Sequence, residues 1–550
     1  MTSPTLEAPE LTPIDRYLAE QADLTAVERF AQRHHTSALP AHSRYYRDLV
    51  PLQRPAPGQQ YGFEVDLDAC TGCKACVSAC HNLNGLDAGE SWRTVGLVHG
   101  GTEAAPRLQT VTTGCHHCVD PACLKGCPVN AYQKDAVTGI VAHLDDQCIG
   151  CRYCVLTCPY EVPRYNPHLG IVRKCDLCAG RLATGEAPAC VQSCPNAAIR
   201  VSLVDTAAAR GAAAVGPLVP GAPASSITVP TTTYRSERPL EELSSSAPGT
   251  PALRVGQSHP PLAVMLVLTQ LAVGTSVVAL AARALAPGAL VDALRPATAV
   301  VALAVGVVAL AASVCHLGRP AYAFRAVLGL RRSWLSREIL AFGAFAALAG
   351  AHSWALVTDA GSPVEPVLAT SAAVTGVAGV ACSALVYAVT RRAWWALPRT
   401  AAKFALSSLS LGTATVLATT VVSALVIGGA GAGRAASQLV PPLAAAAAAV
   451  TLLKLGAEAM FLRHRRTGAP PELHRSALLL LGPLRARTQW RFVTGVVGAV
   501  LASAVALAAA TPATVLVLAV SCFAALLSGE LLERWQFFTA VAPPRMPVGH

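Results

Sequence analysis

The chain has 550 residues, of which 53% are hydrophobic and only 14% are charged, and its formal net charge is +11. Residues up to about 260 are polar and rich in cysteine and proline, whereas the rest runs through long uncharged stretches of Ala, Val and Leu. This uneven composition predicts a soluble half followed by a membrane half. The excess positive charge does not indicate nucleic-acid binding, because much of it is arginine in short loops between apolar runs.

Residues 1–57 predict an extension that precedes the cysteine-rich region. The stretch PIDRYLAEQADLTAVERFAQRH has helical spacing and mixed charge, so we expect it to pack on the cysteine-rich domain or on a partner subunit. The N-terminus carries no basic region followed by an apolar one and no twin arginine, so no export signal is expected. A thiol-rich domain that is not exported stays in a reducing compartment, which favours metal binding over disulfides.

Sixteen of the 19 cysteines form four groups between residues 70 and 194. Groups one and three follow the pattern C-x2-C-x2-C-x3-C, which is typical of iron–sulfur cubes. Groups two and four keep the outer CxxC and the final CxxxC around a longer middle gap, and proline follows the last Cys in groups two, three and four. The groups are Cys70, Cys73, Cys76 and Cys80; Cys115, Cys118, Cys123 and Cys127; Cys148, Cys151, Cys154 and Cys158; and Cys175, Cys178, Cys190 and Cys194.

Zinc is the main alternative to iron, since CxxC pairs also build zinc ribbons. Tetrahedral zinc sites use two pairs separated by a longer stretch, whereas group one has four Cys within eleven residues. We therefore predict four [4Fe–4S] clusters and no disulfides. His116 and His117, inside group two, are expected to lie at the surface or to contact a partner. Five cations beside the ligands either raise the cluster potentials or are simply solvated, namely Lys74, Lys125, Arg152, Arg173 and Lys174.

The cysteine-rich region resembles the four-cluster iron–sulfur subunit of the dimethyl-sulfoxide reductase group of molybdoenzymes. The resemblance covers roughly residues 58–203 and rests on YGFEVDLDACTGCKACVSAC, CHHCVDPACLKGCPVNA, DDQCIGCRYCVLTCPYEVPRYN, KCDLCAGR and PACVQSCPNAAI. It implies an α+β ferredoxin-like domain, residues 58–204, in which group one pairs with group four and group two with group three. The implied ligand sets are Cys70, Cys73, Cys76 and Cys194; Cys80, Cys175, Cys178 and Cys190; Cys115, Cys118, Cys123 and Cys158; and Cys127, Cys148, Cys151 and Cys154.

Residues 205–260 are rich in Ala, Pro, Ser and Thr and predict a linker between the two halves. Eight apolar runs follow, each near the ~20 residues that a helix needs to cross a membrane. They predict an all-α domain of eight transmembrane helices over residues 261–540, with a tail at 541–550. The runs are 262–283, 297–317, 338–358, 367–390, 403–428, 438–460, 491–510 and 512–532.

The other three cysteines and the arginines of the second half mark two further features. Cys315, Cys382 and Cys522 lie in or beside apolar runs and are expected to be small buried hydrophobes. Arginine is concentrated in the loops after runs two, four and six, which the positive-inside rule places in the cytoplasm. We therefore predict a multi-pass protein of the cytoplasmic membrane, with both termini and the cluster domain in the cytoplasm. The arginines are Arg319, Arg325, Arg331, Arg332, Arg391, Arg392, Arg399, Arg463, Arg465, Arg466, Arg475, Arg485 and Arg487.

Two ionisable residues at the cytoplasmic boundary are candidates for a quinone site. His316 ends run two and Glu338 opens run three, and such a pair suits the protons that a quinol releases with its electrons. Capping of helix ends is the alternative. The segment CHLGRPAYAFRAVLGLRRSWLSREI resembles the eight-helix anchor subunit of the same group, whose HLG histidine and S-x-E glutamate serve the quinol site. The resemblance assigns these roles to His316 and Glu338, with Arg319 as a third candidate.

Other polar residues of the apolar half give three more expectations. SGELLERWQFF resembles the terminal motif of the anchor subunit, with Glu530 and Arg534. Lys454 and Glu458 lie four residues apart on one helix and are expected to pair. No haem b is expected, because His316 and His352 are separated by about 24 Å of helix rise and cannot share one iron.

The combined features predict that two subunits that are usually separate are fused in one chain. This chain would be the electron-transfer and membrane-anchor subunit of a molybdopterin oxidoreductase complex, with a separate catalytic subunit of the bis-MGD type as its partner. Electrons would pass between menaquinone or ubiquinone and that subunit through four [4Fe–4S] clusters. A membrane redox module that serves a non-molybdenum partner is the alternative, and a zinc-bound scaffold without a redox role is a third hypothesis.

Overall fold

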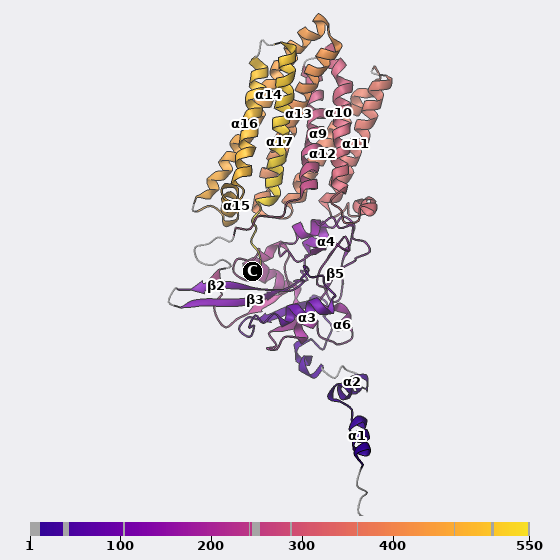
Figure 1. The fold of residues 1–550 in the computed structure, drawn as a ribbon, viewed down its shortest axis with the longest axis vertical. Coiled ribbons are helices and arrows are strands. Elements are labelled where there is room, and N and C mark those ends of the chain that lie inside the picture. Colours follow the sequence, from indigo (N-terminus) through magenta and orange to yellow (C-terminus); the bar gives the residue numbers. More distant parts are fainter. Residues whose placement is uncertain are drawn as a thin grey trace, which may run out of the picture.

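The computed structural model describes residues 12–36, 43–102, 105–240, 243–244, 253–285, 289–359, 361–466, 468–507 and 511–547. Small sheets and short helices lie against one end of a bundle of long helices, and the two N-terminal helices lie beyond them (Figure 1). The predicted fold, a ferredoxin-like α+β domain followed by eight membrane-spanning helices, is confirmed. We call residues 58–244 the cluster domain and residues 253–547 the membrane domain.

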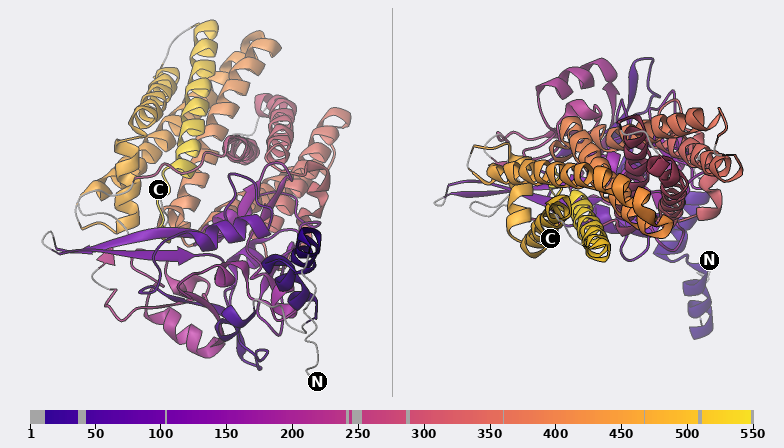
Figure 2. Two further views of the ribbon diagram at one scale, coloured as in Figure 1. Left: turned by 60° about the horizontal axis from the view of Figure 1, so that its bottom comes forward. Right: turned by 90° about the horizontal axis from the view of Figure 1, so that it is seen from above.

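The cluster domain has ten short strands in four sheets within its described residues. β1 pairs antiparallel with β8 and parallel with β9. The β2–β3 hairpin projects from the side of the domain (Figures 1 and 2), and the β4–β5 and β6–β7 hairpins each lie between two cysteine groups. The strands are β1 Gln59–Asp66, β2 Thr94–Gly101, β3 Pro106–Thr113, β4 Tyr132–Lys134, β5 Val141–His143, β6 Arg164–Asn166, β7 Ile171–Arg173, β8 Ile199–Asp205, β9 Thr233–Arg235 and β10 Leu243–Ser244.

Short helices begin inside the cysteine groups. Lys74 and Arg152 precede α3 and α5 in the left-handed conformation, with φ of 63° and 59°, which residues other than glycine rarely adopt. Each of these two residues lies between the second and third Cys of its group. The chain therefore turns sharply between two thiols that are expected to bind the same cluster. The helices are α3 Ala75–Leu83, α4 Ala122–Gly126, α5 Tyr153–Thr157, α6 Ala179–Ala183 and α7 Ala189–Gln192.

The segment predicted as a linker, residues 205–260, is largely folded onto the cluster domain. It forms α8 (Thr206–Val215), β9 and β10, and Thr231 and Val219 are buried. Thr231 Oγ1 donates a hydrogen bond to the backbone carbonyl of His116 at 2.8 Å. Its small side chains therefore serve packing against the cluster domain, which composition could not distinguish from a flexible linker.

The N-terminal extension forms two helices, α1 (Pro13–Ala22) and α2 (Ala26–Thr36). Each starts with a capping box, Thr12 with Asp15 and Thr25 with Glu28, which explains why the predicted helical stretch is split. Ile14 is 70% exposed, and no residue of α1 is buried. The predicted packing of this extension on the cluster domain is therefore wrong for α1, and contact with a partner stays a prediction.

Each predicted apolar run corresponds to one long helix of the membrane domain. These helices are apolar on all sides, as expected where lipid or other helices surround them. The short helix α15 (Pro471–Leu481) between α14 and α16 was not predicted. The long helices are α9 Pro260–Leu285, α10 Ala289–Val314, α11 Trp334–Thr358, α12 Glu365–Ala388, α13 Leu397–Ile427, α14 Gly429–Phe461, α16 Arg485–Leu507 and α17 Pro512–Thr539.

The three cysteines of the membrane domain differ in exposure. Cys522 in α17 is buried, as predicted, whereas Cys382 in α12 is half-buried. Cys315 is exposed, so the prediction of burial is wrong for this residue. The reason is local, because α10 ends at Val314 and Cys315 follows the last residue that the helix holds in the bundle.

Glycine allows the closest helix crossing in the bundle. A Cβ atom at Gly274 of α9 would lie 1.9 Å from the carbonyl oxygen of Ser408 in α13, and one at Gly412 would meet the backbone of Gly274. In lipid, close backbone approach between small residues is a main source of helix association. The α9–α13 crossing therefore holds the first four long helices against the last four.

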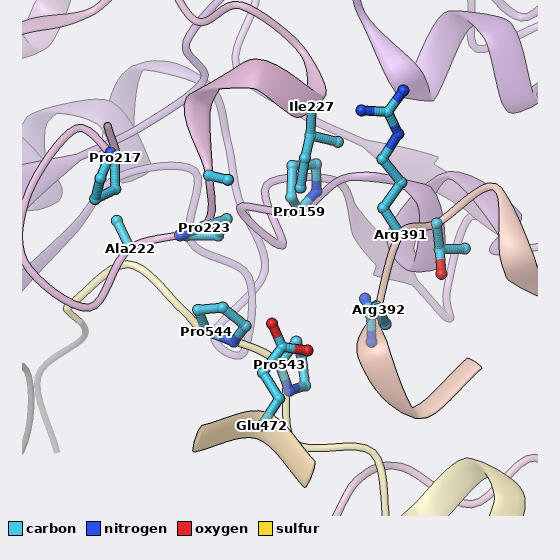
Figure 3. Close-up of a pocket in the computed structure, with 12 residues that line it drawn as sticks. Pro159, Pro217, Ala222, Pro223, Ile227, Arg391, Arg392, Glu472, Pro543 and Pro544 are labelled. Atoms are coloured by element: carbon cyan, nitrogen blue, oxygen red, sulfur yellow. The ribbon is translucent and has the colours of Figure 1, made fainter. Parts of the chain in front are cut away.

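A cavity of about 330 Å³ lies where the cluster domain meets the membrane domain (Figure 3). Pro159 and Ile227 line it from the cluster domain, while Arg392, Glu472 and Pro543 line it from the membrane domain. The C-terminal segment after α17 thus returns to the cluster domain, where Arg545 pairs with Glu161 at 3.1 Å. The two domains therefore meet at this edge, where five separate parts of the chain line the cavity.

Candidate functional site

Several thiols of different cysteine groups lie together as in the four ligand sets that the resemblance implies, which we call sets A to D. Set C is the clearest, because its four thiols line one common cavity. In set D, burial and then Cys127 raise the pKa of Cys151 to about 12, which places these two thiols side by side. The sets are A (Cys70, Cys73, Cys76 and Cys194), B (Cys80, Cys175, Cys178 and Cys190), C (Cys115, Cys118, Cys123 and Cys158) and D (Cys127, Cys148, Cys151 and Cys154).

Backbone amides directed at the thiols fit these sets to iron–sulfur clusters. Ala131 and Ala198 donate to Cys127 Sγ and Cys194 Sγ at 3.2 and 3.3 Å, each from four residues after the cysteine. The N–H of Gly150, two residues after Cys148, donates to that thiol at 3.4 Å. Hydrogen bonds of this kind stabilise the anionic sulfurs of a bound cluster.

The neighbours of individual thiols indicate the order of the sets. Burial raises the pKa of Cys76 in set A against the opposing effects of Arg93 and Thr112, and Cys190 of set B adds to the rise. Burial raises the pKa of Cys175 in set B, and the next largest cause is Cys115 of set C. Burial also raises the pKa of Tyr132, to which thiols of sets C and D contribute. The four sets therefore follow one another in the order A, B, C, D. The exposed Cys73 belongs to set A, at one end of this line.

Arg93 is a buried cation that lies outside every cysteine group, so motif spacing could not reveal it. It is 3% exposed and donates to Thr112 Oγ1 at 3.3 Å. Burial opposes its charge, but the thiols of Cys190 and Cys76 raise the pKa of the guanidinium above its ordinary value. Arg93 thus lies between sets A and B, where a fixed positive charge would raise the potential of a bound cluster.

The prediction that His116 and His117 lie at the surface is wrong, because they are 2% and 1% exposed. The ring of His116 packs edge-on against Tyr160, with 4.4 Å between ring centroids, and neither ring nitrogen has a hydrogen-bond partner among the described residues. Lys174 is also buried, at 3% exposure, and its Nζ donates to the carbonyls of Val141 and Cys175. The alternative that Lys174 is simply solvated is therefore excluded.

His117 is held in one tautomer between sets B and C. Its Nδ1 accepts the backbone N–H of Val141 at 3.1 Å, and its Nε2 lies 4.0 Å from Cys175 Sγ. Burial and then Lys174 hold the pKa of His117 well below its usual range, so the ring is neutral at pH 7. The proton of the neutral ring must then reside on Nε2, which makes His117 a weak donor to a cysteine of set B.

We expect His117→Leu, which removes the N–H donor, to lower the midpoint potential of one cluster by about 40 mV, the equivalent of one hydrogen bond of about 1 kcal/mol. Redox titration of isolated membranes, followed by electron paramagnetic resonance, measures this shift. His116→Leu is the matched control, because His116 is equally buried but its ring makes no hydrogen bond within the described residues, and it should leave all four potentials unchanged. Equal shifts in the two variants would show that burial and not the N–H donor sets the potential.

Set D lies directly against the membrane domain. Three hydrogen bonds join the two domains here: Gly329 N–H to Pro128 O at 2.7 Å, Ser333 Oγ to Gly126 O at 2.7 Å, and Arg319 N–H to Ile149 O at 3.1 Å. All three acceptors lie within two residues of a set D cysteine or between two of them. The loop between α10 and α11 thus forms the surface against which set D lies.

Glycine is required on both sides of this contact between the loop and the cluster domain. A Cβ atom at Gly318 would lie 2.0 Å from the carbonyl oxygen of Gly170, and Gly170 itself has φ of 67°. Gly318 directly follows the His316–Leu317 pair in the loop, so the backbones of the two domains touch beside His316. The HLG sequence therefore positions the loop against the cluster domain as well as carrying a histidine.

His316 and Glu338 both lie beside residues 151–153 of the cluster domain. His316 is half-buried, and burial and then Arg152 lower its pKa to about 4, while the carbonyls of Ser313 and Cys151 act in the opposite direction. Glu338 is 3% exposed and accepts a hydrogen bond from Ser383 Oγ of α12. Its charge also contributes to the raised pKa of Tyr153, after the larger effect of burial. The structure thus places both candidates next to set D.

Arg319, the third candidate for the quinone site, forms hydrogen bonds with the cluster domain. Its Nη1 donates to Asp145 O at 2.9 Å, and its Nε donates to Leu169 O at 3.3 Å. Arg325 makes a similar bond to Asp146 O at 2.9 Å. The described hydrogen bonds of Arg319 therefore hold the cluster domain against the loop, and its contact with quinone stays a prediction.

A buried polar network fills the other half of the membrane domain. The predicted Lys454–Glu458 pair is wrong: Lys454 Nζ donates to Ser407 Oγ at 2.6 Å and to Glu530, and Glu458 is bound by Arg491 at 3.0 and 3.1 Å. Arg491 also reaches Glu530 at 3.0 Å. Two carboxylates and two cations from α14, α16 and α17 thus compensate one another inside the membrane.

The terminal motif of α17 supplies more of this network. Arg534 is fully buried and donates to Gln270 Oε1 at 2.9 Å and to Ser407 Oγ at 3.0 Å. Glu533 accepts from Lys403 at 2.9 Å. The sequence singled out Glu530 and Arg534 by resemblance but missed Glu533, whose partner Lys403 lies 130 residues away in the sequence.

His352 lies at the opposite end of the bundle. Its Nε2 is 2.8 Å from Glu365 Oε1, while Arg283 and Arg295 bind the other oxygen of Glu365 at 2.7 and 2.5 Å. His316 lies beside the cluster domain, so the two histidines remain at separate ends of the helices. This arrangement agrees with the spacing argument against a shared haem.

Comparison with known proteins agrees with this division of the polypeptide. Residues 107–203 match a family described as a 4Fe-4S dicluster domain, and residues 253–539, more than half of the full length, match the DMSO reductase anchor subunit (DmsC). YnfG of Escherichia coli (strain K12), whose name describes it as part of a probable anaerobic dimethyl sulfoxide reductase, is 40% identical over 154 residues. These residues are 26% of this chain and 75% of YnfG.

Two further relatives belong to other enzyme systems. The formate dehydrogenase iron-sulfur subunit of Haemophilus influenzae is 36% identical over 153 residues, covering 25% of this chain and 49% of that protein. The Hydrogenase-2 operon protein HybA of Escherichia coli O157:H7 is 36% identical over 190 residues, covering 30% of this chain and 57% of that protein. The fold, the four cysteine sets and the eight spans agree with the family matches on both halves. The chain therefore belongs to the DMSO reductase anchor subunit family and carries the iron–sulfur electron-transfer domain of the DMSO reductase family in the same polypeptide.

Proposed function

We propose that this protein transfers electrons between the membrane quinone pool and a separate molybdopterin catalytic subunit of the bis-MGD type. The cluster domain would receive or deliver electrons at the membrane end through set D and exchange them with the catalytic subunit at the exposed end, near Cys73. When bound, four [4Fe–4S] clusters would supply one-electron carriers along this line. The quinone, menaquinone or ubiquinone, would bind at His316 and Glu338.

The observation that carries this proposal is the position of set D against the loop that bears His316. Cys151 lies beside the His316 ring, and Tyr153, two residues later, donates its hydroxyl to Val386 O of α12 at 2.7 Å. Glu338 is bonded to Ser383 one turn earlier on that helix. A quinol at this place would have a neutral imidazole and a buried carboxylate within reach of its hydroxyls and a cluster directly beyond them.

Metal analysis of the complex, purified gently from membranes through a tag on this chain, tests the proposal. We expect about sixteen irons per chain, four for each cluster, with stoichiometric molybdenum or tungsten and a large co-purifying subunit. Zinc in place of iron would remove the electron-transfer function. Sixteen irons without molybdenum or tungsten would keep the clusters and the quinone site but exclude a molybdenum partner.

The second candidate function, a redox module for a non-molybdenum partner, has support from one relative. The name of HybA refers to a hydrogenase operon, and HybA matches this chain over more residues than YnfG does. The same metal analysis separates the two candidates, because nickel or iron in the co-purifying subunit would replace molybdenum.

We also propose that the cluster domain faces the cytoplasm. The Arg-rich loops contact it: Arg325 binds Asp146 O at 2.9 Å, and Arg392 binds Leu156 O at 3.1 Å. Loops rich in arginine remain in the cytoplasm in most membrane proteins, so the domain they contact would lie there as well. Alkaline phosphatase fused after His550 should be inactive, whereas green fluorescent protein at the same place should fluoresce. The opposite pattern would place the domain outside the membrane.

A further inference from the structure

A cavity of about 170 Å³ lies in the membrane domain, apart from His316 and Glu338. Residues of α13, α14, α16 and α17 line it at the ends of these helices that face the cluster domain. Lys454, which lines its inner side, is seven residues before the end of α14 and thus about 10 Å deep along the helix. The cavity therefore reaches from the membrane boundary to the buried polar network.

The cavity opens between two helices. Ala402 of α13 and Ala457 of α14 line it, and both are exposed on the surface of the bundle. Ala402 is five residues from the start of α13 and Ala457 four residues from the end of α14, so both lie about 6–8 Å from the helix ends. A molecule dissolved in the lipid could therefore enter sideways between these small residues.

The walls of the cavity fit an aromatic ring with oxygen substituents. Trp394 and Phe461 form one wall, with ring centroids 4.7 Å apart. Lys403 Nζ lies 4.3 Å from the centroid of the Trp394 ring and donates to Glu533 Oε1 at 2.9 Å. Aromatic faces accept a flat ring, and the ammonium group can donate to a carbonyl oxygen.

Glu533 provides an unsatisfied acceptor at this place. It is 2% exposed, and its buried Oε2 accepts no hydrogen bond from the part of the chain that the structure describes, although Lys454 Nζ and Arg534 Nη1 form ion pairs with it at 3.8 and 3.4 Å. A buried carboxylate oxygen without a donor is costly, so a hydroxyl group that bonds to it gains free energy. A ring hydroxyl of a quinol is such a donor.

A phosphate headgroup fits less well. Arg399 already donates to the backbone carbonyl of Ala393 at 2.5 Å, Lys403 is paired with Glu533, and Lys454 is paired with Glu530. Glu458 and Glu533 also line the cavity, and their charges would repel an anion. The lining therefore favours a neutral ligand that both donates and accepts hydrogen bonds.

We propose that this cavity is a second binding site for the quinol headgroup, separate from His316 and Glu338. The inference rests on the proposed function for the identity of the ligand. Glu533 accepts a hydrogen bond from one ring hydroxyl, Lys403 donates to the other ring oxygen, and Trp394 and Phe461 contact the ring. The site is also joined to set D, because Arg392 next to this wall bonds to Leu156 O in the helix between Cys154 and Cys158.

Photolabelling of membranes that contain the whole complex tests the second site. With an azido-menaquinone probe, we expect labelled peptides from residues 397–407 and 454–461 in addition to peptides around 316–338. Ala402→Trp and Ala457→Trp should each reduce the labelling of 397–407 and 454–461 at least tenfold and leave that of 316–338 unchanged. Ala401→Trp is the matched control, since Ala401 is exposed on the same helix but does not line the cavity.

The outcomes separate this inference from the proposed function. Labelling around 316–338 alone would overturn the second site and leave the quinone function intact, whereas labelling at neither place would overturn both. Labelling of 397–407 that persists in both tryptophan variants would show a surface contact and overturn the cavity site. Mass spectrometry of the purified complex that finds a tightly held phospholipid, lost in both variants, would assign the cavity to lipid instead.

Discussion

Glu338→Gln should lower the rate of quinol-dependent cluster reduction at least 100-fold while leaving all four clusters in place. Glutamine keeps the size of the side chain and can still accept the hydrogen bond from Ser383 Oγ, so the local packing is preserved. What it loses is the ability to take a proton. A positioned general base contributes about 10²–10⁴ to a rate, and a quinol cannot release its electrons without releasing protons.

His316→Gln should have a similar effect for a related reason. Burial and then Arg152 lower the pKa of His316 to about 4, so the ring is neutral at pH 7 and can accept a proton from the quinol. The rate should therefore stay near its maximum above about pH 5 and fall only where His316 itself becomes protonated. His316→Gln would remove this acceptor and leave the docking contacts of Gly318 and Arg319 in place.

The measurement is the rate at which a reduced menaquinone analogue reduces the clusters in membranes, read from their absorbance. Reduction by dithionite and the electron paramagnetic resonance spectrum report whether the clusters are assembled, and rates are normalised to them. Glu365→Gln serves as the control, because Glu365 is an equally buried carboxylate of the same domain at the opposite end of the bundle. Rates within a few-fold of the unaltered protein in both Glu338 and His316 variants would place quinol oxidation elsewhere.

Glu530→Met should destabilise the membrane domain by about 3–5 kcal/mol, the second large effect that the structure predicts. Glu530 is 2% exposed and binds both Lys454 and Arg491. Its removal leaves Lys454 with Ser407 Oγ and a carboxylate 3.8 Å away at Glu533, inside an apolar environment. An uncompensated buried cation accounts for most of the expected loss.

The Lys454→Met, Glu530→Met double variant should recover much of this loss, because Arg491 keeps Glu458 as its partner and no cation is left unpaired. Thermal unfolding of the detergent-solubilised protein, followed by the loss of its monodisperse elution peak, ranks the variants. Arg463→Met, at an exposed position in the loop after α14, is the control and should change stability by less than about 0.5 kcal/mol. Additive losses in the double variant would show that Lys454 and Glu530 do not act as a pair.

The sequence by itself determined the chemistry of the cluster domain and the number of membrane spans. Cysteine spacing is a local property, because a C-x2-C-x2-C-x3-C run directs its first three thiols to one cluster and its fourth to a neighbouring cluster. Membrane spans are equally local, since a helix in lipid must satisfy its own backbone over about 20 apolar residues. These features follow from short stretches of sequence and could therefore be predicted.

Only the tertiary structure decided which residues surround those features. His116 and His117 are polar and sit in a loop, but the segment 206–235 folds over that region and buries them, as the bond from Thr231 to the His116 carbonyl shows. The composition of that segment is the same for a linker and for a well-packed surface layer. Burial depends on contacts more than 100 residues apart, which no local pattern encodes.

The same limit explains the errors in the membrane domain. Helical spacing made Lys454 and Glu458 neighbours, but α17 brings Glu530 closer to Lys454, and α16 brings Arg491 to Glu458. In a low-dielectric interior each charge binds the partner that packing offers, so the helix arrangement and not the sequence spacing selects the pairs.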